Sequence, residues 1–541
     1  MIMPFIRKYN SGMLFVMGCC LTLWVIWDWN SIVLLNNEKS LKYITRRKTI
    51  EYASFGPIES ETTVIFSRGQ HGYNTSRIPA LVYHNDYFLA FCEARKDTHR
   101  DIGNMDIILR RGKRKGWKVE WSDAKTVVSM PGMRTMNPVP IVDKELDMLL
   151  MVFIAIPSHI SQWKLMRDGL YQQAVLVTRS FDNGETWTAP QDITDSTLAA
   201  IRPLPALYAP GPGHGIKLKS GRLMVPGNYF VKDHIGMHLV DLDNFSNTTN
   251  YANVIYSDDF GDNWQTGGKI PFSQEPKSGY PIHTNEATVV ELDNGTVMLN
   301  TRTLNALLPR IQSYSVDGGL TFSYPKIKQE LIEPGFKIVD DFYTIPSKAA
   351  GCQGSVIAFP SPDPNHPRKR WLLFSNPASR KFRDYMTVKL SLDGGETWSP
   401  GWMVYNLKSS YSDLTYFEDT DPFTGKMTQN FAILFEGGLE QPHESILFKT
   451  FNLDAFYRGQ EFSQKFEPIR KSDSLEDYEL IRVKRPEDFE PIRVKGANNF
   501  EPIGAKGPDD FEAILANKPG DFEQLKVDNL NNLEKEDALT L

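Results

Sequence analysis

The sequence is poor in cysteine. Four cysteines occur in 541 residues, Cys19 and Cys20 in an apolar N-terminal stretch and Cys92 and Cys352 in the body. This number excludes a disulfide framework and a cysteine zinc cluster, and it leaves open only a Cys92–Cys352 pair. Clusters of histidine with cysteine and calcium-loop patterns are lacking too, so we expect a protein that needs no metal and no other cofactor.

The chain also has almost no excess of either charge. Its 60 Lys and Arg residues and 66 Asp and Glu residues give a formal net charge of -6 at pH 7. Proteins that hold nucleic-acid phosphates usually carry a clear basic excess. We therefore expect no nucleic-acid partner.

Long amphipathic helical patterns are missing, and strand patterns fill residues 57–458. Apolar and polar residues alternate there in short runs separated by Gly, Asp and Asn, as in ATVVELDNGTVMLNTR from Ala287 to Arg302. Such alternation around such turns is typical of β-hairpins. The sequence therefore predicts an all-β domain over residues 57–458.

One turn pattern, S-x-D-x-G-x-x-[W/F], occurs four times in this region. The copies begin at Ser180, Ser257, Ser315 and Ser391, at intervals of 77, 58 and 76 residues. We expect a hairpin turn in which the Asp side chain caps backbone N–H groups, Gly supplies a positive φ and the aromatic ring packs beneath. These aspartates are thus interpreted as structural, and the repeat lengths predict a propeller of six to eight blades.

An apolar run precedes the predicted domain. Residues 13–27, MLFVMGCCLTLWVIW, follow Arg7 and Lys8, and no A-x-A cleavage site is visible. We interpret residues 1–40 as an uncleaved anchor or signal anchor and residues 41–56 as a linker, which predicts a membrane-associated protein. The basic residues after the run favour a cytosolic body. Four N-glycosylation sequons favour a lumenal body instead, and they begin at Asn74, Asn244, Asn247 and Asn294.

The C-terminal part is repetitive. Aromatic residues stand eleven residues apart in charged units that contain Pro or Gly, at Phe489, Phe500, Phe511 and Phe522. One aromatic residue per unit cannot build a core, so residues 459–541 are predicted to be a disordered tail. A period of eleven is also compatible with a supercoiled helix. The prolines in the units argue against a continuous helix.

Short motifs between these ends carry a family resemblance. They are TSRIPALVY, FCEARKDTHRDIGNMDIILRRG, PGMRTMNPVP, GPGHGIKLKSGRLMVP, NEATVVELDNGTVMLNTR, GCQGSV and YSDL. Together with the four turns, known in that family as Asp boxes, they resemble the sialidase (neuraminidase) family, and most of all its animal members, from about residue 60 to about residue 450. The resemblance implies a six-bladed β-propeller with its site at the axial mouth.

The same resemblance implies an activity and its partners. The activity is that of a retaining exo-α-sialidase, which hydrolyses terminal sialic acid from gangliosides, glycoproteins or oligosaccharides. The implied partners are sialylated glycolipids and glycoproteins, and the membrane.

By resemblance, three arginines hold the carboxylate of the sugar. They are Arg77 of SRIP, Arg302 of LNTR and Arg383 of SRKFRDYMTV, and Arg380 is the alternative to Arg383. Arginine suits an anion beside the bond being broken, because its guanidinium is planar, always charged and bidentate toward carboxylates. Glu436 of ILFEGG matches the family's glutamate that orients the first arginine.

A neutral nucleophile is expected beside this anion, because a second carboxylate would repel it. Sialidases use tyrosine, and Tyr411 of YSDL stands at that position, with Glu286 of TNEATVVEL as its base. Asp101 is identified by the same resemblance as the acid that protonates the leaving oxygen. Three neighbouring acids, Asp97, Asp106 and Glu291, are interpreted as structural. Glu291 is expected on an exposed strand end.

Peripheral contacts to the substrate are also implied. Arg95 of CEAR and the pair Met136 and Asn137 of RTMNP resemble such contacts. Gln162 of SHISQWK stands where animal relatives usually carry a glutamate. Glutamine still hydrogen-bonds a sugar but is no ionised partner, which leaves room for a different pH optimum or substrate range.

Two other functions stay open at this point. One is a trans-sialidase, which uses the same chemistry with a sugar acceptor in place of water. The other is a catalytically weak propeller that only binds sialic acid. The joint presence of Asp101, Tyr411 and Glu286 disfavours the second function.

Overall fold

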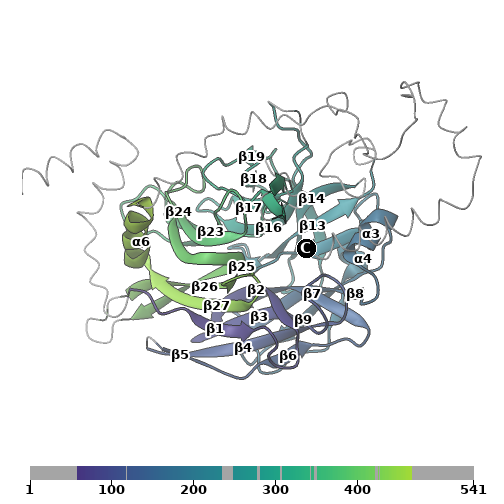
Figure 1. The fold of residues 1–541 in the computed structure, drawn as a ribbon, viewed down its shortest axis with the longest axis horizontal. Helices are drawn as coiled ribbons and strands as arrows, with labels where there is room; N and C mark the ends of the chain where they lie inside the picture. The colour runs from purple at the N-terminus through teal and green to yellow at the C-terminus, as the bar shows by residue number, and fades with distance from the viewer. Residues whose placement is uncertain are drawn as a thin grey trace, which may run out of the picture. The chain divides into compact units, whose positions relative to one another are not determined.

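The computed structural model describes residues 58–116, 118–233, 248–276, 279, 281–304, 308–340, 343–346, 350–420, 425 and 427–465. The expected anchor (1–40), the linker (41–56) and the tail beyond residue 465 lie outside these residues. No helix in the described part is long and apolar enough to cross a membrane. The prediction of an all-β fold is confirmed, because strands dominate and the helices are short (Figure 1).

The first sheet has nine strands in the order β10-β9-β8-β7-β4-β3-β2, with β5 and β6 paired on β4. The bounds are β2 Thr75–His84, β3 Tyr87–Arg95, β4 Met105–Lys115, β5 Lys118–Trp121, β6 Lys125–Val128, β7 Met133–Asp143, β8 Met148–Pro157, β9 Ala174–Ser180 and β10 Gln191–Asp192. A single parallel pair, Met105 with Arg134, joins β4 to β7. The sheet therefore consists of two antiparallel groups, β2 to β6 and β7 to β10.

The second sheet joins both ends of the described chain. Its order is β1-β27-β26-β25-β24-β23-β22. The bounds are β1 Thr63–Ser67, β22 Ser355–Pro360, β23 Arg370–Pro377, β24 Asp384–Ser391, β25 Trp402–Thr420, β26 Met427–Gly438 and β27 Ser445–Asn452. Figure 1 shows β1 beside β27, and the pairing of Thr63 with Phe448 fixes their register. The long strand β25 pairs with β24 near its start and with β26 along the rest.

The remaining strands form three smaller sheets. One has the order β11-β13-β14-β15 with β12 paired on β13, another the order β16-β17-β18-β19, and the last consists of β20 and β21. The bounds are β11 Leu207–Pro210, β12 Ile216–Lys217, β13 Leu223–Val231, β14 Thr249–Ser257, β15 Gln265–Lys269, β16 Thr284–Glu291, β17 Val297–Thr303, β18 Ile311–Ser315, β19 Lys326–Ile327, β20 Phe336–Asp340 and β21 Tyr343–Pro346. The helices are α3 Gln162–Asp168, α4 Thr194–Leu198 and α6 Leu453–Lys465.

The four repeated turns share one hydrogen-bond pattern. In each, the Ser Oγ accepts the backbone N–H of the Gly four residues later, at 2.8 to 2.9 Å. The Asp carboxylate accepts a backbone N–H two residues beyond that Gly, at 2.8 to 3.0 Å. These glycines have φ between 81° and 91°, the left-handed region that glycine adopts without strain. The aspartates are therefore occupied in holding the turns.

The third of these turns lies at the end of its sheet opposite Arg302 of β17. Ser315 starts the third turn and pairs with Val297 at the beginning of β17. Arg302 lies near the other end of the same strand, whose last residue Thr303 pairs with Thr284. Because antiparallel neighbours run in alternate directions, the arginine and the turn are at opposite ends of this sheet.

The C-terminal helix extends past the predicted domain boundary at residue 458. Helix α6 ends at Lys465, and its residues Leu453, Ala455 and Phe456 are buried. Gly459 packs so closely on Trp402 that a Cβ atom there would lie 1.9 Å from the indole. The predicted start of the tail at residue 459 therefore falls inside α6, which continues to Lys465.

A truncation pair tests this boundary. A chain that ends after residue 465 is expected to keep the melting temperature of the full chain. A chain that ends after residue 452 loses buried Phe456 and its neighbours, which should cost about 3–5 kcal/mol of unfolding free energy. Calorimetry of the two chains checks this, and equal melting temperatures would show that α6 does not stabilise the domain.

Candidate active site

Arg77 is fixed by a buried carboxylate. It lies on β2, and its Nε donates to Glu436 Oε1 on β26 at 3.2 Å. The same oxygen accepts the backbone N–H of Ile78 at 2.9 Å. Ile78 has φ +58°, an unfavourable conformation for a β-branched residue. Burial alone would raise the pKa of Glu436, but Arg77 and the Ile78 N–H hold it below its usual range. The ionised carboxylate thus holds both the arginine and the strained backbone.

Arg302 is paired with the proposed base. Its Nη1 donates to Glu286 Oε2 at 2.8 Å, and its Nε donates to the carbonyl of Ala350 at 2.9 Å. The two side chains come from the neighbouring strands β16 and β17. A register irregularity between Thr284 and Ala287 surrounds Glu286 on β16. Arg302 is 5% exposed, so its charge acts in a poorly hydrated place.

Arg383 lies in the segment before β24. Its Nη2 donates to the carbonyl of Gly351 at 3.2 Å, and its Nη1 donates to Ser410 Oγ at 3.3 Å. The alternative, Arg380, is exposed. The structure therefore places Arg383, and not Arg380, beside the residue that precedes Tyr411.

Tyr411 lies among the three arginines. The Cζ atoms of Arg77 and Arg383 are 5.5 and 5.6 Å from the centre of its ring. Arg302 Nη1 is 3.4 Å from the phenol oxygen, and the phenol donates a short hydrogen bond to Glu286 Oε1. Burial and the Glu286 charge raise the pKa of Tyr411 well above its usual range, against the opposing effect of the arginines. The phenol is therefore neutral, with an acceptor for its proton in place.

Asp101 lies in the loop between β3 and β4, next to a buried arginine. Its Oδ1 is 2.8 Å from Arg95 Nη2, and its side chain is 27% exposed. Burial alone would raise the pKa of Asp101, but the charges of Arg95, Arg77 and Arg134 lower it. The carboxyl group is thus ionised when no substrate is bound. Arg95 also donates to Glu93 Oε2, from Nε at 3.1 Å and from Nη2 at 2.7 Å.

The neighbouring acids have structural partners. Asp106 accepts hydrogen bonds from Tyr73 Oη at 2.8 Å and pairs with Lys96 at 2.9 Å. Asp97 accepts the backbone N–H of Asn104 at 3.3 Å. The prediction that Glu291 is exposed was wrong, because it is only 8% exposed. Its carboxylate accepts the backbone N–H of Lys219, where the segment after β12 covers the end of β16.

The expected peripheral contacts are mostly buried. Met136 and Asn137 are 4% and 8% exposed. The backbone N–H of Asn137 donates to Glu93 Oε1 at 2.8 Å, and its side chain donates to the carbonyl of Pro210 at 3.0 Å. Gln162 is the first residue of α3, after the N-cap Ser161.

Two buried carboxylates were missed by the sequence reasoning. Asp413, two residues after Tyr411, accepts the backbone N–H of Leu81 at 2.8 Å and Ser355 Oγ at 2.7 Å, and it pairs with His214 at 2.8 Å. Glu93 binds Arg95 as described above. Each stands two residues from a predicted site residue on the same strand. That spacing was the available signal for both.

The two body cysteines do not form a disulfide. Cys92 and Cys352 are both free and buried, so the pair left open by the sequence does not exist. Cys352 Sγ lies 3.5 Å from Ser410 Oγ. Within the described ranges, no group of three or more His, Cys, Asp and Glu residues is arranged to hold a metal ion.

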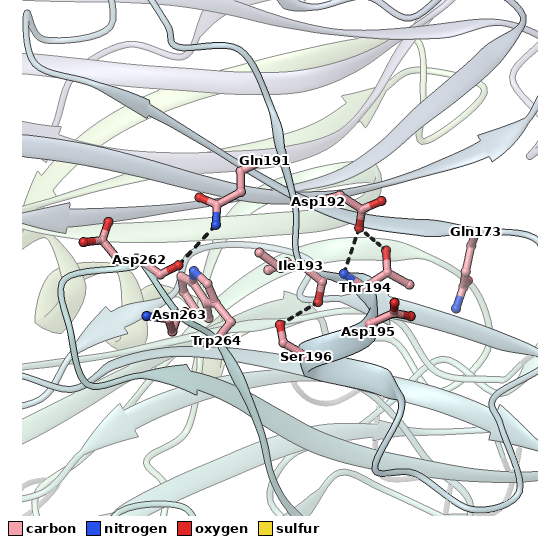
Figure 2. Close-up of a pocket in the computed structure, with 10 residues that line it drawn as sticks. All are labelled: Gln173, Gln191, Asp192, Ile193, Thr194, Asp195, Ser196, Asp262, Asn263 and Trp264. Carbon is pink, nitrogen blue, oxygen red and sulfur yellow. Dashed lines mark hydrogen bonds between the residues drawn. The ribbon is translucent and has the colours of Figure 1, made fainter.

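A separate cavity of about 570 Å³ contains none of these residues. Figure 2 shows that its lining comes from β10, α4 and the second repeated turn, and includes Asp192, Asp195, Asp262 and Trp264. Asp192 caps Thr194, and the Gln191 amide donates to the carbonyl of Asp262 at 3.1 Å. These polar groups hold loops together, so we place the site at the arginines and not in this cavity.

The arrangement around Tyr411 can bind an anionic molecule and place a nucleophile against it. Three guanidinium groups surround one phenol, and arginines of this kind bind carboxylates through paired hydrogen bonds. The phenol and Glu286 form a nucleophile with an adjacent base. Asp101 supplies a carboxyl group on a neighbouring loop.

Comparison with known proteins gives relatives along most of the chain. A family model described as a BNR repeat-like domain matches residues 86–424. Human sialidase-3 is 29% identical over 418 residues, which cover 70% of this chain and 89% of that protein. Mouse sialidase-2 is 30% identical over 419 residues, which cover 73% of this chain and 96% of that protein.

Solved structures share the fold. The Hadza microbial sialidase Hz136 aligns with a TM-score of 0.55 and 23% identity, over 73% of this chain and 69% of that chain. Trypanosoma rangeli sialidase in complex with sialic acid aligns with a TM-score of 0.53 and 18% identity, over 74% of this chain and 60% of that chain.

Proposed function

Because this chain belongs to the sialidase family and is a glycoside hydrolase, we propose that it is a retaining exo-α-sialidase with Tyr411 as nucleophile. Its substrates are gangliosides, glycoproteins or oligosaccharides that end in sialic acid. The observation that carries the proposal is the phenol of Tyr411, which donates to Glu286 in the middle of three arginines.

The first half of the reaction forms a covalent sugar–enzyme bond. Arg77, Arg302 and Arg383 bind the carboxylate of the sugar. Glu286 takes the Tyr411 proton as the phenol oxygen attacks the anomeric carbon, and Arg302 stabilises the negative charge that develops on that oxygen. Meanwhile Asp101 gives its proton to the leaving oxygen, and the bond to the aglycone breaks.

The second half releases the sugar. Asp101, now ionised, takes a proton from water, and the water oxygen attacks the anomeric carbon. The bond to Tyr411 breaks, and Glu286 returns the proton to the phenol oxygen. Two displacements at one carbon retain its configuration.

Substrate binding prepares Asp101 for its first step. The charges of Arg95, Arg77 and Arg134 lower the pKa of Asp101. A substrate carboxylate on Arg77 offsets one of these charges and so raises that pKa. The acid therefore gains its proton when the substrate is present.

A six-bladed propeller is the proposed architecture. The strand pairing supports six groups of about four antiparallel strands: β2 to β6, β7 to β10, β11 to β15, β16 to β19, β22 to the start of β25, and the rest of β25 with β26, β27 and β1. The proposed location is at a membrane, through residues 1–40. The apolar run in the sequence supports this location.

Arg77→Lys tests the substrate-binding part of the proposal. Arg77 uses Nε for Glu436 and has its remaining nitrogens for the sugar, whereas one ammonium group cannot hold both in the same geometry. We expect KM for a fluorogenic sialoside to rise about 10- to 100-fold, the loss of one charged hydrogen bond. Arg380→Lys, an exposed control, should change nothing.

Release of the fluorescent aglycone, measured across pH, checks both variants against the intact chain. An unchanged KM for Arg77→Lys would remove this arginine from the site. Addition of a lactose acceptor to the same assay separates hydrolysis from transfer, since a trans-sialidase would form sialyl-lactose.

A further inference from the structure

Two histidine rings stack beside the proposed acid. His99 lies in the loop between β3 and β4, two residues before Asp101. His443 lies in the turn between β26 and β27, far away in the sequence. Their ring centres are 4.7 Å apart, and the ring planes differ by 17°. The stack therefore joins the loop of the acid to the strand pair that carries Glu436.

The loop of Asp101 is held from inside by Arg95. This arginine donates from Nη1 to the backbone carbonyl of His99 and contacts Asp101 through Nη2. At its far end, the backbone N–H of Gly103 donates to the carbonyl of Ser158 at 3.0 Å. The side chain of His99 points from this loop to a different element, so it adds a third attachment.

The turn of His443 is a firm support. The Glu444 carboxylate accepts the backbone N–H groups of Leu439, Glu440 and Gln441 at 2.9, 2.9 and 2.7 Å. The backbone carbonyl of Glu444 accepts the N–H of Arg68 at 2.9 Å. These bonds fix the turn without His443, which leaves its ring available for the stack.

The charges around the stack favour neutral rings. Four arginines act on the two histidine rings: Arg77 on β2, Arg68 after β1, and Arg95 and Arg100 at the Asp101 loop. Two carboxylates, those of Glu436 and Glu444 on the strands β26 and β27 and their connecting turn, act on His443. Burial and the arginines lower the pKa of both rings, that of His443 to about 4. Neutral imidazoles can stack, whereas two protonated rings repel each other.

We propose that the stack of His99 on His443 is a positioning contact, which holds the Asp101 loop at the leaving oxygen of the substrate. The inference rests on the proposed function, in which Asp101 is the acid. Neither histidine touches the reacting atoms in this account. Both act through the place of the Asp101 carboxyl group, where a shift of about 1 Å is enough to slow a reaction on the order of 100-fold.

The first test removes the ring. His443→Ala should lower kcat/KM for a sialyl oligosaccharide about 10- to 100-fold, because its alkoxide leaving group needs a well-placed acid. On a nitrophenyl sialoside, whose phenolate departs without a proton, kcat/KM should stay within about 3-fold, because kcat/KM reports the first displacement and not the later step in which Asp101 activates water. His84→Ala is the matched control, since His84 is buried, pairs with Asp147, and lies at the other end of β2.

The second test restores a flat ring that cannot ionise. His443→Phe should return kcat/KM for the oligosaccharide to within about 3-fold of wild type. In the wild type, the pKa of His443 is lower in the folded chain than in the unfolded chain, so the unfolded chain takes up the proton first as the pH falls. The free energy of unfolding therefore decreases as the pH falls from about 6.5 to about 4. The melting temperature of His443→Phe should fall less than that of wild type across this window.

The outcomes are distinguishable. An equal fall in kcat/KM on both substrates in His443→Ala, or no fall on either, would overturn the positioning role. Failure of His443→Phe to restore the oligosaccharide rate, in a variant with the wild-type melting temperature at pH 7, would also overturn it. A wild-type chain that is inactive on both substrates would overturn the proposed function itself.

Discussion

Tyr411→Phe is expected to abolish turnover of every sialoside, lowering kcat on the order of 10³-fold or more. The variant keeps the ring that Arg77 and Arg383 contact, and it loses only the oxygen that donates to Glu286. Substrate binding should therefore change little. Because no aryl-oxygen bond to the sugar can form, a better leaving group does not rescue the rate. Tyr416→Phe is the matched control, because Tyr416 lies on the same strand and its phenol bonds Glu418 at 2.6 Å and no proposed site residue.

The stereochemistry of the released sugar provides a second test of the Tyr411→Phe variant. Any turnover that remains must come from direct attack by water, which inverts the anomeric carbon. The wild type should release the sugar with retained configuration in a proton NMR time course. A Tyr411→Phe variant with near wild-type kcat and retained product would show that another group is the nucleophile.

Asp101→Ala is expected to separate substrates by their leaving groups. The aglycones of natural sialosides leave as alkoxides and need a proton, so kcat/KM for these substrates should fall about 10²- to 10⁴-fold, the usual contribution of a general acid. A nitrophenyl sialoside needs no proton to leave and should lose far less in its first step. Asp97→Ala is the control, because Asp97 caps Asn104 in the same loop.

The test is a comparison of kcat/KM for the two substrates in each variant, because kcat/KM reports the first displacement and excludes the later step in which Asp101 activates water. Equal losses on both substrates for Asp101→Ala would assign Asp101 a structural role, for example as the partner of Arg95. Equal effects of Asp97→Ala and Asp101→Ala would show that only the loop matters, and not the identity of the acid.

Alternation and turn chemistry were enough to predict the fold class. Strands such as β16 and β17 follow the ATVVEL-DNG-TVMLNTR pattern, and local hydrogen bonds decide the four turns. The helix α6 was missed because its burial depends on Trp402, which comes from a strand about fifty residues earlier. No local pattern reports such a contact.

The site was predicted as a set of residues but not as a geometry. Resemblance named Arg77, Tyr411 and Glu286, and the structure brings all three together. The pairing of Arg95 with Asp101 needed the structure, because it depends on how the loop after β3 folds back. Glu291 was predicted to be exposed because it precedes a turn in the sequence. The structure shows it covered by the distant segment of Lys219, whose backbone N–H it accepts.

The central claim, that Tyr411 forms the bond to the sugar, has one direct test. A fluorinated sialic acid slows the second displacement and should accumulate on the wild-type chain as a covalent adduct. Digestion and mass spectrometry are predicted to place the adduct in the peptide SSYSDLTY, on Tyr411, and Tyr411→Phe should give none. Adduct found on a carboxylate such as Glu286, with Tyr411 unmodified, would contradict the account.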